Sequence, residues 1–191
     1  MLDLKESFWS VPEEEWKRLW VRVRWREFSD TREKPTADTD CVNLAELMQQ
    51  DVDASFGFRS LALYSGARCT GISAVSPFFL DVDLDGDTQA ALDNLLARVR
   101  DELDSRHWWY RVYRSGVGYH VEVDPISIAP GSWCLDGGYF RKLLADISEA
   151  VDGRCAPPDG GKACIDRPHA LIRMVGSAHR IGTTKMLIDG P

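Results

Sequence analysis

The feature that most constrains this chain is a short apolar run, residues 77–80, which passes directly into the alternating segment Asp81-Val82-Asp83-Leu84-Asp85. Successive side chains of a β-strand point to opposite faces of the sheet. We therefore expect the acidic side chains to share one face of a strand and the aliphatic side chains to pack into a core on the other. The sequence therefore predicts a strand with one face in the hydrophobic core and the other face negatively charged.

This charge pattern predicts a metal site. Carboxylates held a few ångströms apart repel one another, and proteins usually tolerate this where a cation or a shared proton offsets the repulsion. Asp81 and Asp83 therefore favour a hard divalent cation such as Mg²⁺ or Mn²⁺, which prefers oxygen ligands. The alternative is a strand that ends in a solvated acidic turn.

Two further interpretations fit parts of the same segment. Asp81-x-Asp83-x-Asp85-Gly86 matches the first half of a calcium-binding EF-hand loop, but Leu92 stands where that loop needs a bidentate Glu. The run from Asp83 through Asp87-Thr88 resembles, with one inserted residue, the nucleophile loop of haloacid-dehalogenase-like phosphatases. A metal-dependent phosphatase is therefore an alternative function.

Composition bounds the class of protein. A chain of 191 residues with 44% hydrophobic content fits one domain, either compact or two-lobed. The sequence contains no run of eighteen apolar residues and no basic-then-apolar leader, so we expect neither a membrane span nor secretion. Five cysteines without regular spacing predict reduced thiols and a cytoplasmic location.

The charges are distributed unevenly. Residues 1–104 carry 12 Lys and Arg against 21 Asp and Glu, a balance of −9, whereas residues 105–191 carry 11 against 9, a balance of +2. The second half therefore has the capacity to bind an anionic ligand, with a solvated basic face as the alternative. The basic residues that we expect on one such surface are Arg106, Arg111, Arg114, Lys162, Arg167, Arg173, Arg180 and Lys185.

Hydrophobic periodicity predicts an alternation of strands and helices, and hence an α/β or α+β domain. Ser10 followed by Pro12 and three acids is typical of a helix start, with Trp16 and Trp20 four residues apart on one face. The expected helices cover residues 42–50, 88–103 and 139–151, and the expected strands residues 21–26, 61–64, 108–113 and 121–123, with two short strand-like runs after residue 163.

Two more segments carry candidate ligand groups. Ser115-Gly116-x-Gly118-x-His120 lies between two expected strands, and glycine backbone N–H groups with a His can hold phosphate oxygens. The alternative is a glycine-rich hairpin followed by a core His.

Near the C-terminus, Asp166 follows an apolar residue and precedes a polar segment. This segment is typical either of a site that binds a polyanion or of an exposed basic loop. Its candidate ligands are Arg173, Ser177, His179 and Lys185.

The three segments in this order resemble the archaeo-eukaryotic primase superfamily, which includes replicative small primase subunits, primase-polymerases of plasmids and phages, and the polymerase domain of bacterial end-joining ligases. The resemblance covers about half of the chain, residues 78–185. It implies a two-lobed α/β catalytic domain with an RRM-like sheet that carries the acids. It also implies a primase or DNA polymerase that uses single-stranded DNA and nucleoside triphosphates. A helicase domain or subunit is the expected partner, and the chain is either a complete protein or one domain of a longer replication protein.

Carried over by position, the resemblance implies that Asp81, Asp83 and Asp166 bind two Mg²⁺ or Mn²⁺ ions and are catalytic. The residues that it implies for nucleotide binding are Ser115, Gly116, Gly118, His120, Arg173, Ser177, His179 and Lys185. A non-catalytic nucleotide-binding or nucleic-acid-binding module of the same fold is the other alternative.

Some relatives in the superfamily also carry zinc. Cys155, Cys164 and His169, joined by Cys134 or His107, are the candidate ligands here. Their spacing is irregular, which favours isolated buried cysteines instead.

Overall fold

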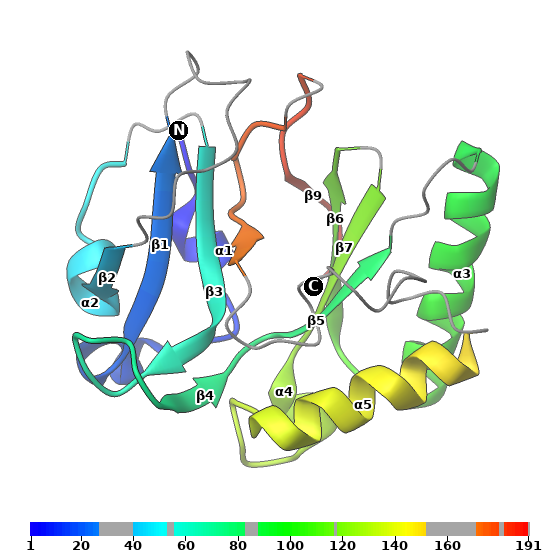
Figure 1. Ribbon diagram of the computed structural model, residues 1–191. Coiled ribbons are helices and arrows are strands. Elements are labelled where there is room, and N and C mark those ends of the chain that lie inside the picture. The colour runs from blue at the N-terminus through cyan, green and yellow to red at the C-terminus, as the bar shows by residue number, and fades with distance from the viewer. Residues whose placement is uncertain are drawn as a thin grey trace.

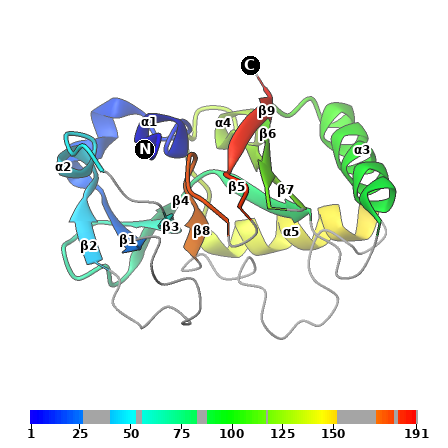
Figure 2. The ribbon, with the colours of Figure 1, turned by 90° about the horizontal axis from the view of Figure 1, so that it is seen from above.

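The computed structural model describes residues 1–26, 40–52, 56–82, 88–116, 118–151, 171–179 and 182–190. These residues form a mixed α+β fold with two antiparallel sheets, as the alternating sequence pattern predicted in general terms. Figure 1 shows one sheet around β1 and β3 and a second around β5, β7 and β6, with the long helices α3 and α5 beside the second sheet. Seen from above, β8 lies between these two groups of elements (Figure 2).

The first sheet has the strand order β2-β1-β3-β4, and β8 also pairs with β3. Its strands are β1 (Trp20–Arg26), β2 (Asp40–Asn43), β3 (Phe56–Tyr64), β4 (Ile72–Val75) and β8 (Leu171–Arg173). The expected strand over residues 21–26 is confirmed, whereas the strand expected over 61–64 is the end of the longer β3. Because β8 pairs with the first half of β3, the C-terminal segment returns to the centre of the molecule.

The second sheet has the order β5-β7-β6-β9, all antiparallel. Its strands are β5 (Phe78–Val82), β6 (Tyr110–Ser115), β7 (Gly118–Val123) and β9 (Met186–Asp189). Helix α3 (Gln89–Ser105) connects β5 to β6, and α5 (Gly137–Ala150) follows β7. This sheet carries both the acidic strand and the glycine turn of the sequence analysis.

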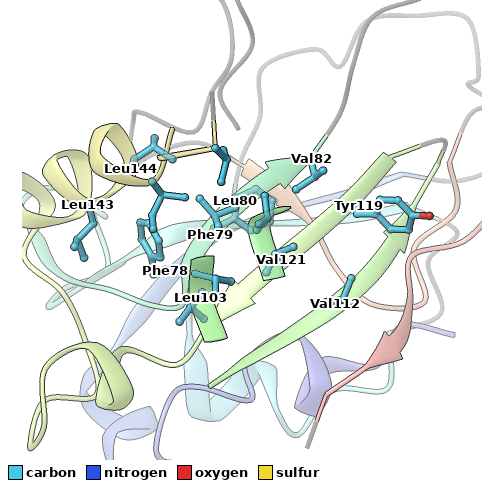
Figure 3. Packing of buried hydrophobic residues seen from close by; sticks show 14 of the residues in the cluster. Phe78, Phe79, Leu80, Val82, Leu103, Val112, Tyr119, Val121, Leu143 and Leu144 are labelled. Atoms are coloured by element: carbon cyan, nitrogen blue, oxygen red, sulfur yellow. The ribbon is translucent and has the colours of Figure 1, made fainter. Parts of the chain in front are cut away.

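The larger hydrophobic core lies between the second sheet and the two long helices. Figure 3 shows Phe78, Leu80 and Val82 of β5 packed in the same cluster as Val121 of β7 and Leu144 of α5. The helix expected over 88–103 is α3, and the residues that it buries recur at helical spacing: Leu92, Leu95, Leu96, Val99 and Leu103. The aliphatic face of the acidic strand is therefore core, as predicted, and Asp81 on the opposite face is only partly buried.

The N-terminal region differs from the expected single helix. It forms α1 (Leu4–Ser7) and then a short 3-10 helix, η1 (Glu13–Arg18), while Trp20 already belongs to β1. The prediction failed because the spacing of Trp16 and Trp20 matches a helical period although the two residues belong to different elements. Similarly, the helix expected over 42–50 is reduced to α2 (Leu44–Leu47), because Asn43 ends β2 and caps the helix with its side chain. A further short helix, α4 (Pro125–Ile128), was not predicted.

The structure also corrects the expectation of reduced thiols throughout. Cys41 on β2 and Cys69 in the loop after β3 form a disulfide, with their Cα atoms 6.0 Å apart. Sequence separation hid this pair, because the two residues meet only after β2 and β3 have both paired with β1. Cys134 is a free cysteine. In the parts of the chain that the structure describes, no helix is long and apolar enough to cross a membrane.

Candidate functional site

The candidate site lies on the face of the second sheet that points away from α3 and α5. Side-chain alternation places Asp81 on this face of β5, and His120 and Glu122 on this face of β7. The register pairs Asp81 with His120 directly across the two strands. The acidic strand and the glycine-turn segment, which are separated by α3 and β6 in the chain, therefore present their polar residues to the same place.

His120 and Asp81 lie close together across the two strands. The Nε2 atom of His120 lies 3.9 Å from Oδ1 of Asp81, and the imidazole packs edge-on against Phe79 with the ring centres 4.9 Å apart. Burial, reinforced by the positive groups of Lys185, Arg173 and His179, holds the pKa of His120 well below its ordinary value. His120 is therefore a neutral imidazole near pH 7, and its buried Nδ1 has no hydrogen-bond partner among the described residues.

The glycine turn connects β6 to β7, and Gly116 in this turn lies against the ring of His179. Ser115 pairs with Gly118 at the end of the hairpin, and Gly116 has a φ of +69°, a conformation that non-glycine residues rarely adopt. A Cβ atom placed on Gly116 would lie 2.9 Å from the His179 ring. The turn therefore packs closely against the His179 ring. A phosphate contact at the same turn stays a prediction from the sequence.

Arg173 reaches the same region from β8. Its Nη1 donates a hydrogen bond to the carbonyl of Ala178, and its guanidinium carbon lies 5.3 Å from the centre of the Phe58 ring. Burial lowers the pKa of Arg173, while the nearby Asp81 carboxylate raises it. Four predicted residues, Asp81, His120, Arg173 and His179, are thus brought together from three separate segments of the chain.

Ser177 and Lys185 occupy a different environment, because both are fully buried. The hydroxyl of Ser177 accepts a hydrogen bond from the backbone N–H of Gly57 at 3.0 Å. The ammonium of Lys185 forms an ion pair with Glu122, with Nζ 2.6 Å from Oε1. Residues 176–179 pair with residues 182–185, and we call these two segments the C-terminal hairpin. Ser177 connects this hairpin to β3 of the first sheet, and Lys185 connects it to β7 of the second.

Asp83 and Asp166 lie outside the described residues, as do Cys155, Cys164 and His169 of the zinc hypothesis. Within the described ranges, no group of three or more His, Cys, Asp or Glu residues could hold a metal ion. Asp81 is partly exposed beside a neutral imidazole, so its oxygens suit a hard cation. The three-carboxylate set remains the expectation from the sequence.

Of the residues expected on one basic surface, Lys185 is buried, whereas Arg106, Arg111 and Arg114 are partly exposed and paired with side chains of the protein itself. Arg106 and Arg111 make ion pairs with Glu102 and Glu6, and Lys185 is buried against Glu122. Arg114 donates a hydrogen bond to Gln89. The positive charge that does gather around His120 comes from Arg173, His179 and Lys185.

Sequence reasoning missed two buried charged residues beside the site, Glu122 and Arg59. Glu122 accepts hydrogen bonds from Lys185 and from the indole N–H of Trp9. Arg59 on β3 donates to the carbonyls of Ser60 and Ser76, and it lies 4.6 Å from the centre of the Phe8 ring. A signal for Glu122 was available, because it lies two residues after His120 on a strand and therefore shares its face.

The sequence matches no protein-family model, and no curated protein matches it either.

Proposed function

We propose that this protein is a metal-dependent nucleotidyltransferase that synthesises or extends primers on single-stranded DNA from nucleoside triphosphates. The observation that carries the proposal is the group of Asp81, His120, Arg173 and His179. It combines a partly exposed carboxylate with a neutral imidazole and with cationic side chains. Such a set can hold a polyphosphate and a divalent cation side by side.

The topology of the second sheet supports the same proposal. The chain runs β5-α3-β6-β7, then the single-turn helix α4 and the long helix α5, and β7 lies between β5 and β6. This matches the first five elements of a split βαββαβ fold, which is the RRM-like arrangement that the resemblance to the primase superfamily implies. Asp81 lies near the end of β5, and the resemblance implies that the acids are carried by this sheet.

In the proposed site each residue has a specific task. Asp81, with Asp83 and Asp166, would hold two Mg²⁺ or Mn²⁺ ions, which supply activation of a 3′-hydroxyl and stabilisation of the leaving pyrophosphate. Arg173 and His179 bind oxygens of the incoming triphosphate, while the neutral His120 donates one N–H to it. We also propose that the protein works with a helicase domain or subunit. The cytoplasmic location stays a prediction that has lost its support from reduced thiols, because Cys41 and Cys69 form a disulfide.

The test is incubation with single-stranded DNA, labelled nucleotides and Mg²⁺ or Mn²⁺. We expect products with wild type, and a loss of about a hundredfold or more in Asp81→Ala, because the variant lacks a ligand that acts in the transition state. The matched control Asp101→Ala removes an exposed carboxylate of α3 and should keep full activity. Both variants should unfold within about 1 kcal/mol of wild type.

Other outcomes would identify the alternatives. Template-independent release of inorganic phosphate from a monoester would indicate a phosphatase. Metal-independent retention of DNA without any product would indicate a binding module of the same fold. Full incorporation by Asp81→Ala would remove Asp81 from the proposed site.

A further inference from the structure

Glu122 is the buried acid at the centre of this region. Its side chain is 1% exposed, and it lies on β7 two residues beyond His120, on the same face of the sheet. One carboxylate oxygen accepts a hydrogen bond from Lys185 at 2.6 Å, and the other accepts one from the indole N–H of Trp9 at 3.0 Å. A buried carboxylate is tolerated because these partners satisfy it.

Lys185 connects this acid to the C-terminal hairpin. Its ammonium also donates to the backbone carbonyl of Arg173 at 3.1 Å. Its backbone N–H donates to the carbonyl of Ser177 at 2.9 Å, and its carbonyl accepts from Gly176 at 2.8 Å. Lys185 therefore bonds both to the end of β8 at Arg173 and to residues 176 and 177, which lead to His179.

The energetics indicate what this ion pair does. Moving two charged groups out of water costs desolvation free energy, which offsets most of their mutual attraction. An apolar pair of similar volume therefore often gives equal or greater stability. A buried pair is nevertheless directional, because two hydrogen-bonded charges fix the relative position of the segments that carry them. Here one segment is β7, which carries His120, and the other is the hairpin.

We propose that Glu122 is a positioning residue of the nucleotide site, and that it acts through Lys185 to hold Arg173 and His179 against His120. This inference rests on the proposed function for its ligand. Glu122 does not contact the nucleotide, and its effect on the site passes entirely through Lys185. The inference also assigns Lys185 a role inside the protein instead of at the triphosphate.

The test is Glu122→Gln, which keeps the size of the side chain and an acceptor for Trp9 but removes the charge that holds Lys185. We expect the KM for nucleotide to rise about tenfold, with kcat and the affinity for single-stranded DNA within about twofold of wild type. The matched control is Glu102→Gln, which breaks an ion pair with Arg106 at the C-terminal end of α3 and should leave all three values unchanged. A wild-type KM in Glu122→Gln would overturn the proposal.

A second variant covers the case in which Glu122→Gln does not fold. The double variant Glu122→Leu with Lys185→Met replaces the pair with apolar side chains of similar volume and should fold. We expect it to show the same rise in KM. If it folds and has the wild-type KM, the pair serves stability alone and the proposal is overturned.

A readout without nucleotide separates this inference from the proposed function. Glu122→Gln should shift the imidazole NMR resonances of His120 and His179, but not that of His107, which follows α3. Unchanged His120 and His179 resonances would overturn the positioning role. A wild-type protein that binds no nucleotide would instead overturn the proposed function, and the two histidine resonances would still decide whether Glu122 positions them.

Discussion

At the scale of single residues, Gly116 determines how the glycine turn and the C-terminal hairpin meet. Its φ of +69° is strained for any residue with a Cβ atom, and that atom would lie 2.9 Å from the His179 ring. We therefore predict that Gly116→Ala costs about 1–3 kcal/mol of unfolding free energy and displaces His179.

The control for this prediction is Gly131→Ala. Gly131 has a similar φ of +88°, but no atom lies within 4 Å of its added Cβ. Urea denaturation should show a smaller loss for this variant, about 1 kcal/mol, from backbone strain alone. Equal losses in the two variants, with an unmoved His179 resonance, would show that the ring adapts and that the contact has no structural consequence.

The candidate site was predictable from sequence only in part. Alternation along a strand was enough to predict that Asp81 lies opposite the core, but its pairing with His120 depends on the register between β5 and β7. The burial of Lys185 was not predictable, because it depends on Glu122, which lies 63 residues away in the chain. A lysine side chain is almost never fully buried unless it is paired, so the residue type alone predicts exposure to solvent.

At the scale of elements, the prediction of secondary structure succeeded for a long helix that packs one face against the hydrophobic core. Helix α3 is long and amphipathic, and Thr88 caps it, so its period is visible in the sequence. Short elements were predicted poorly: α1, which spans four residues, was not predicted, and α2, which also spans four, was predicted too long. Tertiary contacts stabilise such helices, because a single turn is unstable alone.

Helix α1 illustrates this, because it bridges the hairpin and the second sheet. Asp3 pairs with Val175 beside β8, while Glu6 accepts hydrogen bonds from Arg111 and Tyr113 of β6. Phe8, which caps the helix, is 1% exposed.

We therefore predict that Phe8→Ala costs about 3–5 kcal/mol, through a cavity and the loss of the ring that lies against Arg59. Ile126→Ala on α4 is the control, because that side chain is 42% exposed and its truncation should cost less than about 1 kcal/mol. Denaturant titration of both variants measures the difference. A small loss in Phe8→Ala would mean that α1 is not needed to hold the two parts together.

At the scale of the whole molecule, the two main hydrophobic clusters are joined by shared strands. Strand β3 contributes Leu61 to the larger cluster and Leu63 to the smaller one. The C-terminal segment does the same, with Ile172 in the larger cluster and Met174 in the smaller. The proposed site lies among these shared segments, so its geometry depends on both clusters being intact.

This connection predicts that the protein unfolds as one cooperative unit. Leu63→Ala in the smaller cluster and Leu95→Ala in the larger one both remove fully buried side chains, and each should cost about 2–5 kcal/mol. Hydrogen exchange of peptides from β1 and β7, followed through a urea titration, should give one midpoint in each variant. If Leu95→Ala instead exposed β7 at lower urea than β1, the two sheets would be independent units. The pairing of β8 with β3 would then be too weak to couple them, and the site would form only when both units are folded.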